Sequence, residues 1–131
     1  MSWKTVFSLK VRPYQERVQA WVRACFGNET AVNIAERNYR FLEEGLELVQ
    51  SLGCTKEEAL SLVDYVYARP WGEPKQEVGG VMVTLASLCE TADIDMIAEG
   101  EKELRRVWGK VPQIRAKNLT KMKGPLPGVN T

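Results

Sequence analysis

Apolar residues recur at intervals of three and four along most of the chain, which is the period of an amphipathic α-helix. The pattern predicts a first helix that Pro13 opens and Gly27-Asn28 ends. A second, longer helix is predicted from about 30 to 52, where Gly53 is a natural left-handed cap. The residues of these two helices expected to face the interior are Val18, Trp21, Val22, Cys25, Ile34, Phe41, Gly45, Leu48 and Leu52, with Leu42, Leu46 and Val49 beside them.

Capping residues locate the next two elements. Thr55 followed by Glu58 is a capping box, which predicts that "KEEALSLVDYVYA" opens as a helix. The turn "RPWGEP" ends that helix, and Pro74 is placed to begin another across "KQEVGGVMVTLASLCE". The apolar residues expected to face inward from this pair are Ala59, Leu62, Val63, Val66, Val78, Val81, Met82, Leu85, Leu88 and Cys89.

The last predicted helix runs from about 95 to 118. Either Asp93 or Asp95 is placed to cap its first turn, because a short carboxylate can accept from the free N–H groups there. Pro112 falls late in the span and is expected to kink or break it. Its apolar residues are Met96, Ile97, Leu104, Val107, Trp108 and Val111.

The predicted elements indicate an all-α fold, an antiparallel helical bundle joined by short turns. A chain of 131 residues suits a single domain, 1–131. The alternating "FSLKV" permits a short extended arm over residues 1–12. The proline and glycine content of residues 119–131 predicts a mobile tail.

Composition narrows the function classes. With 44% apolar residues, 27% charged residues and a net charge of +1, the chain is neither a disordered segment nor a strongly basic nucleic-acid binder. No apolar run reaches the length of a membrane span and the first residues lack signal-peptide features, so we expect a soluble, cytoplasmic protein without a membrane partner.

The types of residue present also limit the chemistry. The chain has no histidine, which excludes histidine general bases, Ser-His-Asp triads and HExxH zinc sites. Cys25, Cys54 and Cys89 form no CxxC pair, so we expect buried, reduced thiols and neither a disulfide framework nor a zinc site. Any reaction must use carboxylates, lysines, arginines, hydroxyls or a hard metal ion.

The stretch "ERNYRFLEEGLELVQ" in the second helix carries the strongest chemical signal. Arg37, Arg40, Glu44 and Glu47 follow one another at helical spacing and share one stripe, with Glu43 about 100° away. Glu44 and Glu47 are the pair most able to reach one ion, and Mg²⁺ prefers such oxygen ligands. The alternative interpretation is a solvated acidic face with intrahelical ion pairs.

A metal half-site on one helix needs further oxygen ligands from a facing helix. Glu77 lies in the first turn of the fourth predicted helix, with Gly80 and Thr84 following on the same face. Two adjacent glycines inside a helix, Gly79 and Gly80, are destabilising and require a reason. Either close approach of a ligand or tight packing against another backbone would provide that reason.

These stretches, in this order, resemble the MazG-type nucleotide pyrophosphohydrolase superfamily. "FLEEGLELVQ" and the later "EVGGVMV" look like its EExxE and ExxD motifs, and the likeness extends through "LVDYVYARPWGEP" and "KVPQIRAKN" over about residues 18–128. The resemblance implies an all-α enzyme, a homodimer or homotetramer, that hydrolyses nucleoside triphosphates or their deoxy forms to monophosphate and pyrophosphate. It further implies Mg²⁺, with Mn²⁺ as an alternative, and a housecleaning role for the nucleotide pool.

The resemblance assigns roles by position. Glu43 takes the first place of EExxE, Glu44 and Glu47 take its metal-binding places, and Glu77 begins ExxD, so these four are the implied catalytic residues. Gly80 stands where the motif has aspartate, which removes a metal ligand or an orienter of the attacking water. The carboxylates that the sequence leaves open as substitutes are Asp64, Glu73 and Glu36.

Cationic and aromatic side chains are candidates for holding the nucleotide. The arginines are placed to stabilise charge on pyrophosphate, and an aromatic ring can stack on the base. Each has a structural alternative, namely intrahelical pairing, a solvated helix end or core packing. The candidate substrate-binding residues are Arg37, Arg40, Arg115, Lys117, Asn118 and Trp21.

Two other functions stay open at this level. The loss of a ligand at Gly80 fits a non-catalytic nucleotide-binding module, and the acidic stripe fits a helical interaction protein that meets a basic partner. Release of pyrophosphate in the presence of Mg²⁺ would separate the enzyme from both. Nothing in the composition suggests that the partner is a nucleic acid.

Overall fold

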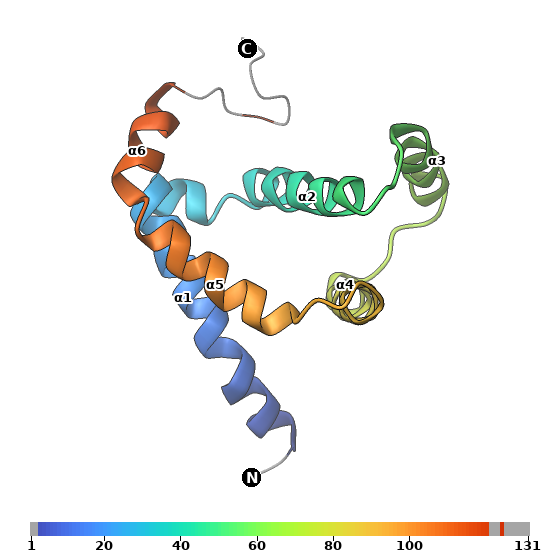
Figure 1. Cartoon of the computed structure of the whole chain (residues 1–131), viewed down its shortest axis with the longest axis horizontal. Coiled ribbons are helices and arrows are strands. Elements are labelled where there is room, and N and C mark those ends of the chain that lie inside the picture. Colours follow the sequence, from blue (N-terminus) through green and yellow to red (C-terminus); the bar gives the residue numbers. More distant parts are fainter. Residues whose placement is uncertain (1–2, 121–123, 125–131) are drawn as a thin grey trace. The chain divides into compact units, whose positions relative to one another are not determined.

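The structure is a computed structural model that describes the backbone of residues 3–120 and Gly124, and the side chains of residues 13–119 and Gly124. Every element in this part of the chain is a helix, which confirms the all-α prediction (Figure 1). The helices are α1 (Trp3–Ala31), α2 (Ile34–Ser51), α3 (Lys56–Tyr67), α4 (Pro74–Thr91), α5 (Met96–Trp108) and α6 (Val111–Thr120). None of the described helices combines the length and the apolar character that a membrane span requires.

Capping places the start of α3 and α4 where the sequence predicts them. The Thr55 hydroxyl accepts from the Glu58 N–H at 3.2 Å, and the Glu58 carboxylate accepts from the Thr55 N–H at 2.9 Å. Hydrogen bonds from the backbone and the side chain of Thr55 lower the pKa of the Glu58 carboxyl group. Pro74 is the first residue of α4, and the Glu73 carboxylate caps it by accepting from the Gln76 N–H at 2.9 Å.

The predicted last helix is two helices. Asp95 is the residue that caps α5, because its carboxylate accepts from the Ala98 N–H at 3.0 Å. Asp93 lies instead in the preceding turn with a left-handed φ of 58°. The break comes just before Pro112, between the end of α5 and the start of α6. A proline in a first helical turn lacks only an N–H that would have no intrahelical partner.

The predicted start of the first helix is wrong. α1 does not begin at Pro13 but at Trp3, so residues 3–12 are helical and not an extended arm. Proline has a helix-compatible φ, and only one backbone acceptor in the preceding turn loses its donor. The predicted end at Gly27-Asn28 is confirmed as a break, because Gly27 has a non-helical φ of 83° and ψ of 164°, and a further short helical stretch of α1 runs on to Ala31. The tail predicted at 119–131 lies almost wholly outside the described residues.

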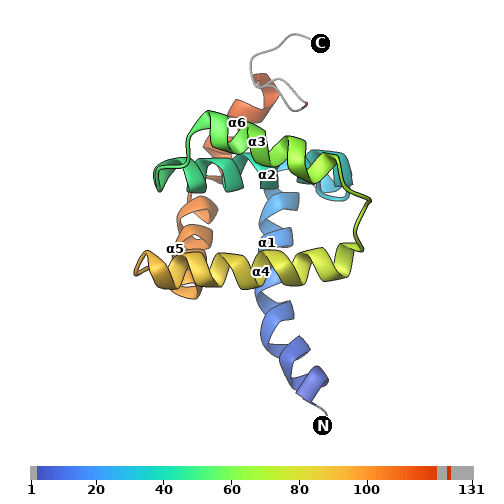
Figure 2. The same ribbon diagram turned by 90° about the vertical axis from the view of Figure 1, so that its right-hand side faces the viewer.

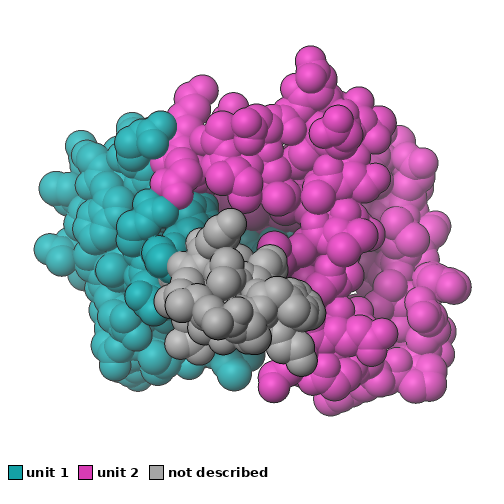
Figure 3. Space-filling view, turned by 90° about the horizontal axis from the view of Figure 1, so that it is seen from below, with its two compact units in different colours: residues 1–43, 104–131 teal, residues 44–103 magenta. Residues whose placement is uncertain are grey.

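The chain divides into two compact units (Figure 3). Unit 1 consists of residues 1–43 and 104–131, and unit 2 of residues 44–103. In unit 1, α1 and α6 pack against each other, and the Arg115 Nε–H donates to the Ala24 carbonyl at 2.6 Å. The Trp21 indole N–H donates to the Val107 carbonyl at 3.0 Å, which ties α1 to the end of α5.

The buried side chains among the described residues of unit 1 are all apolar. They are Val22, Cys25, Ala31 and Leu104. Burial raises the pKa of the Cys25 thiol, and the Arg115 guanidinium opposes this with a smaller lowering effect. All three cysteines are free thiols, and Cys25 and Cys89 are buried as predicted, whereas Cys54 is only half-buried. Cys25 is therefore a buried thiol of the core whose raised pKa disfavours the reactive thiolate.

The predicted burial is wrong for most of α2, α3 and α4. Within unit 2, Cys89 is the only fully buried side chain. α3 and α4 run in opposite directions and are joined by an extended loop (Figure 2). The helical period was identified correctly, but periodicity shows which face of a helix needs cover and not what covers it. The predicted inward-facing residues that are exposed are Ile34, Phe41, Leu52, Leu62, Val63, Val66, Val78, Val81 and Met82.

Candidate functional site

A cavity of about 520 Å³ lies in unit 1, where the kink of α1, the turn to α2 and the first turns of α2 meet Asn118 of α6. Three of the six predicted substrate-binding residues line it. The lining residues are Phe26, Gly27, Asn28, Glu29, Thr30, Asn33, Glu36, Arg37, Arg40 and Asn118.

The kink at Gly27 shapes this cavity. A φ of 83° is accessible to glycine but strained for other residues, so the chain can turn out of the helix at this point. Asn33 then caps α2, because its side-chain carbonyl accepts from the Glu36 N–H at 3.1 Å. The Gln19 amide fixes the other side of the turn by donating to the Ala31 carbonyl at 2.9 Å.

Arg37 is the cationic group of the cavity with the fewest internal partners. Its guanidinium carbon lies 5.6 Å from the centre of the Phe26 ring, in a cation–π contact. Its Nε is buried and has no hydrogen-bond partner among the described residues. Burial lowers the pKa of Arg37, the neighbouring Glu36 raises it and Arg40 lowers it further. A desolvated donor in a cavity favours an anionic ligand.

Arg40 is more fully engaged within the chain. Its guanidinium lies 3.7 Å from a Glu36 oxygen and 3.4 Å from a Glu43 oxygen, and it donates to the Gly124 carbonyl at 2.7 Å. The alternative predicted for the arginines, intrahelical pairing, therefore holds for Arg40. Arg37 forms no ion pair among the described residues, so it is the arginine available to a ligand.

The other predicted nucleotide-binding residues divide between the cavity and the protein scaffold. Asn118 lines the cavity. Arg115 and Trp21 do not line it, because each donates to a backbone carbonyl of unit 1 and holds two helices together. Trp21 also meets the Phe26 ring edge-to-face at 5.9 Å. Lys117 is exposed on α6 and is not part of the cavity lining.

The carboxylates of the EExxE motif lie on successive turns of α2. Glu43 is half-buried and pairs with Arg40, whereas Glu44 and Glu47 are exposed. Their spacing of three residues puts Glu44 and Glu47 on the same side of the helix, as predicted. Among the described residues, however, no group of three or more acidic or thiol side chains is close enough to hold a metal ion. Glu44, Glu47 and Glu77 therefore form no ready metal-binding group in the described part of one chain, and their convergence stays a prediction.

Glu77 instead turns back over the loop that precedes α4. Its carboxylate occupies the position that a Cβ at Gly72 would fill. A Cβ at Gly79 or Gly80 would meet no atom within 4 Å. Nothing in the described part of one chain therefore explains the predicted need for small side chains at these two positions. The Thr84 hydroxyl donates to the Gly80 carbonyl at 2.9 Å, which satisfies it within the helix.

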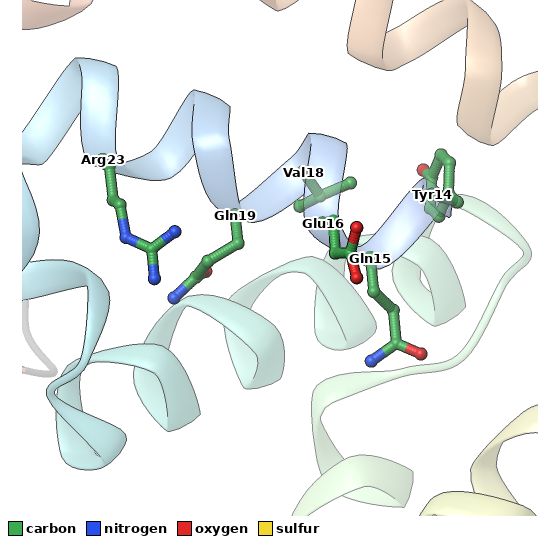
Figure 4. A pocket seen from close by; sticks show the side chains of 6 residues that line it. All are labelled: Tyr14, Gln15, Glu16, Val18, Gln19 and Arg23. Atoms are coloured by element: carbon green, nitrogen blue, oxygen red, sulfur yellow. The ribbon is translucent and has the colours of Figure 1, made fainter. Parts of the chain in front are cut away.

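Two other cavities lack side chains that would converge on a ligand or a metal ion. One, of about 570 Å³, is lined only by α1, from Tyr14 to Arg23 (Figure 4). Because one helix supplies all of its side chains, no groups converge there from different elements. Another, of about 380 Å³, lies at the turn from α4 to α5 in unit 2. Its carboxylates Glu90, Asp93 and Asp95 do not form a metal-binding group.

Several cavity residues were not identified from the sequence. Phe26, Asn28, Thr30 and Asn33 come from a stretch that reads as the end of one helix and the start of the next. The available signal was Gly27-Asn28, which marks a turn between two helices. No family model, no curated protein and no solved structure matches the chain.

Proposed function

We propose that this chain is a nucleotide-binding protein that hydrolyses nucleoside triphosphates to monophosphate and pyrophosphate with Mg²⁺. The observation that supports the proposal is Arg37, a half-buried side chain with a buried Nε that lines a cavity together with Asn118 and has no ion-pair partner among the described residues. The cavity volume of about 520 Å³ is within the range of pockets for small ligands. The resemblance to MazG-type enzymes supports the choice of a triphosphate.

The residues fit a magnesium ion only in part. Glu44 and Glu47 would supply two oxygens, and Mg²⁺ is often held by one or two carboxylates while substrate phosphates and waters complete its shell. Glu77 forms no ready metal-binding group with them in the described part of one chain. When bound, the ion would neutralise phosphate charge and make an attacking water more acidic.

The chain's own residues would carry the remaining steps. Arg37 would hold the phosphate chain by charge-assisted hydrogen bonds, and Asn118 would offer a neutral amide beside it. Water would add to the α-phosphorus as the bond to the bridging oxygen breaks, and an α2 carboxylate would accept the water proton. Glu43 is held by its ion pair with Arg40, so its role would be to orient the attacking water.

Pyrophosphate release is the direct test. We expect turnover of at least one member of a panel of standard and damaged triphosphates with Mg²⁺, and loss of turnover in Glu44→Gln and Glu47→Gln with unchanged helicity. Glu57→Gln on α3 is the matched control, because Glu57 is an exposed glutamate outside the motif. Turnover that is unaffected by both motif variants would reject the assignment.

A non-catalytic nucleotide-binding module is the second candidate. The observation in its favour is the lack of a three-carboxylate group among the described residues, together with Gly80 at the place of the motif aspartate. Nucleotide binding at the Arg37 cavity without pyrophosphate release would select it.

For the enzyme, we expect a homodimer or homotetramer in which the helices complete an antiparallel bundle.

A further inference from the structure

The cavity beside the kink of α1 contains one carboxylate and one guanidinium that lack an ionic partner. Four charged residues line it, Glu29, Glu36, Arg37 and Arg40. The Glu36 carboxylate and the Arg40 guanidinium form an ion pair at 3.7 Å, so their charges offset each other within the lining. Neither Glu29 nor Arg37 forms an ion pair among the described residues. The cavity therefore presents an anionic group and a cationic group that a ligand can engage.

Glu29 and Arg37 belong to different helical segments, and hydrogen bonds hold the turn between them. Glu29 follows the break at Gly27, in the short helical stretch that ends α1, and its side chain is exposed. Arg37 lies in the first turn of α2. The Asn33 N–H donates to the Thr30 carbonyl at 3.2 Å, and the Asn33 carbonyl accepts from the Arg37 N–H at 3.0 Å. The backbone of the turn thus brings both charged residues to the same cavity.

The amide side chains of the lining add hydrogen-bond donors. The side-chain oxygen of Asn28 accepts from the Arg23 Nε–H at 3.2 Å, and that of Asn33 accepts from a backbone N–H of α2 at 3.1 Å. Each amide therefore keeps its NH₂ group for another acceptor. These donors and the Arg37 guanidinium suit the oxygens of a phosphorylated ligand. The Glu29 carboxylate has the opposite preference, because it accepts hydrogen bonds and repels anions.

A ligand that matches this cavity combines an anionic part with N–H donors. A bare phosphate would pair with Arg37 but would be repelled by Glu29, whereas a nucleotide has phosphates at one end and a base with N–H groups at the other. The two oxygens of a carboxylate can accept two parallel hydrogen bonds. Guanine presents two adjacent donors of this kind on its Watson–Crick edge, N1–H and the N2 amino group. Adenine and cytosine place a ring-nitrogen acceptor beside their amino group, and a carboxylate repels that acceptor.

We propose that Glu29 recognises the N1–H and N2 amino groups of guanine and makes the cavity selective for guanine nucleotides. The inference rests on the proposed function, because Arg37 holds the phosphates in that function and leaves Glu29 for the base. A site built to accept hydrogen bonds from a substrate N–H discriminates strongly against an analogue that lacks the donor. Glu29 is therefore a specificity-determining residue and has no part in breaking the phosphoanhydride bond.

Calorimetric titration of the full chain with non-hydrolysable triphosphate analogues and Mg²⁺ tests this selectivity. The guanosine and inosine analogues are the matched pair, since they differ only in the N2 amino group. We expect the inosine analogue to bind about 10-fold more weakly, the lower end of the effect of a hydrogen bond to a charged group, because Glu29 is exposed to water. The adenosine and uridine analogues should also bind more weakly than the guanosine analogue.

Substitutions at Glu29 should remove the selectivity without removing binding. In Glu29→Ala, the guanosine and inosine analogues should bind with equal affinity. Glu29→Gln has one acceptor oxygen and no charge, so it should show an intermediate preference. Arg37→Met should weaken binding of both analogues by the same factor, because their phosphates are identical. Glu16→Gln is the control, since Glu16 is an exposed glutamate of α1 that does not line this cavity, and circular dichroism verifies that each variant folds.

The titrations separate failure of this inference from failure of the proposed function. Equal affinities for the guanosine and inosine analogues in the wild type, or a preference that persists in Glu29→Ala, would show that Glu29 does not recognise the N2 amino group. A tighter complex with the adenosine analogue would exclude guanine selectivity. These results would leave the proposed function intact, because a triphosphate still binds. Failure of every analogue to bind would reject both.

Discussion

The substitution Arg37→Met distinguishes the effect of the Arg37 guanidinium on protein stability from its contribution to ligand binding. In the free protein, the substitution removes a partly desolvated charge whose Nε has no hydrogen-bond partner among the described residues. The substitution removes a cation–π contact with Phe26 that contributes about 0.5–1 kcal/mol of stability. A contact between the methionine sulfur and the same ring contributes about 0.3–1.5 kcal/mol and so offsets the loss. We expect the free energy of unfolding to change by less than about 1 kcal/mol.

Ligand binding should change much more than stability. A hydrogen bond from a charged donor contributes about 1.5–3 kcal/mol, so the dissociation constant for a non-hydrolysable triphosphate analogue should rise by about 10- to 150-fold. Calorimetric titration with Mg²⁺ present measures this, and urea denaturation of the same samples measures stability. Arg105→Met is the matched control, because Arg105 is an exposed arginine of unit 1 that does not line the cavity.

Two outcomes would refute this reasoning. An unchanged affinity in Arg37→Met would show that the guanidinium does not touch the ligand. An equal loss in Arg105→Met would show that only the net charge of unit 1 matters. A fall in unfolding free energy of several kcal/mol would instead make Arg37 a structural residue.

Three further substitutions test the scaffold by thermal or chemical denaturation. Thr55→Ala should lower the free energy of unfolding by about 1 kcal/mol through loss of the capping box, with a smaller effect in acid. The capping hydrogen bonds depress the pKa of Glu58 below its ordinary value of 4.5, so their stabilisation is present above that pH and is lost as the pH falls below it. Trp21→Phe should lower the free energy of unfolding by about 1 kcal/mol, because it removes the indole hydrogen bond to the Val107 carbonyl, which then accepts only from the Lys110 N–H, whereas Trp71→Phe at a fully exposed ring should have no effect. Gly80→Ala should raise stability by about 1 kcal/mol, because its Cβ enters open space, and a loss of stability would instead reveal close approach by another molecule.

Local signals in the sequence predicted the helices well. The capping box at Thr55, the proline that opens α4 and the cap at Asp95 all act within four residues, so the nearby sequence contains the necessary information. The extension of α1 through Pro13 was missed, because a proline fits both a first turn and a helix interior that tolerates one lost hydrogen bond. Burial was missed for a different reason, since it depends on partners distant in sequence or in another chain.

The candidate site was predictable only where one helix contains it. Arg37, Arg40 and the EExxE glutamates keep the order along α2 that their spacing requires. The convergence of Glu77 on Glu44 and Glu47 depends on how separate elements pack, which helical spacing cannot specify, and it stays a prediction. Arg115 and Trp21 show the same limit, because their backbone acceptors, Ala24 and Val107, lie in distant parts of the sequence.

The Glu77 carboxylate lies against Gly72, so the residue at position 72 determines where this carboxylate can lie. Any side chain at position 72 would displace the end of the Glu77 side chain, which is flexible enough to move without disturbing α4. Gly72→Ala is therefore a way to redirect the Glu77 carboxylate while leaving its charge and its place in the sequence unchanged. In a double-mutant cycle, Gly72→Ala and Glu77→Gln should be non-additive in their effect on Mg²⁺ affinity, so a mutational scan that changes only one residue at a time would misjudge both.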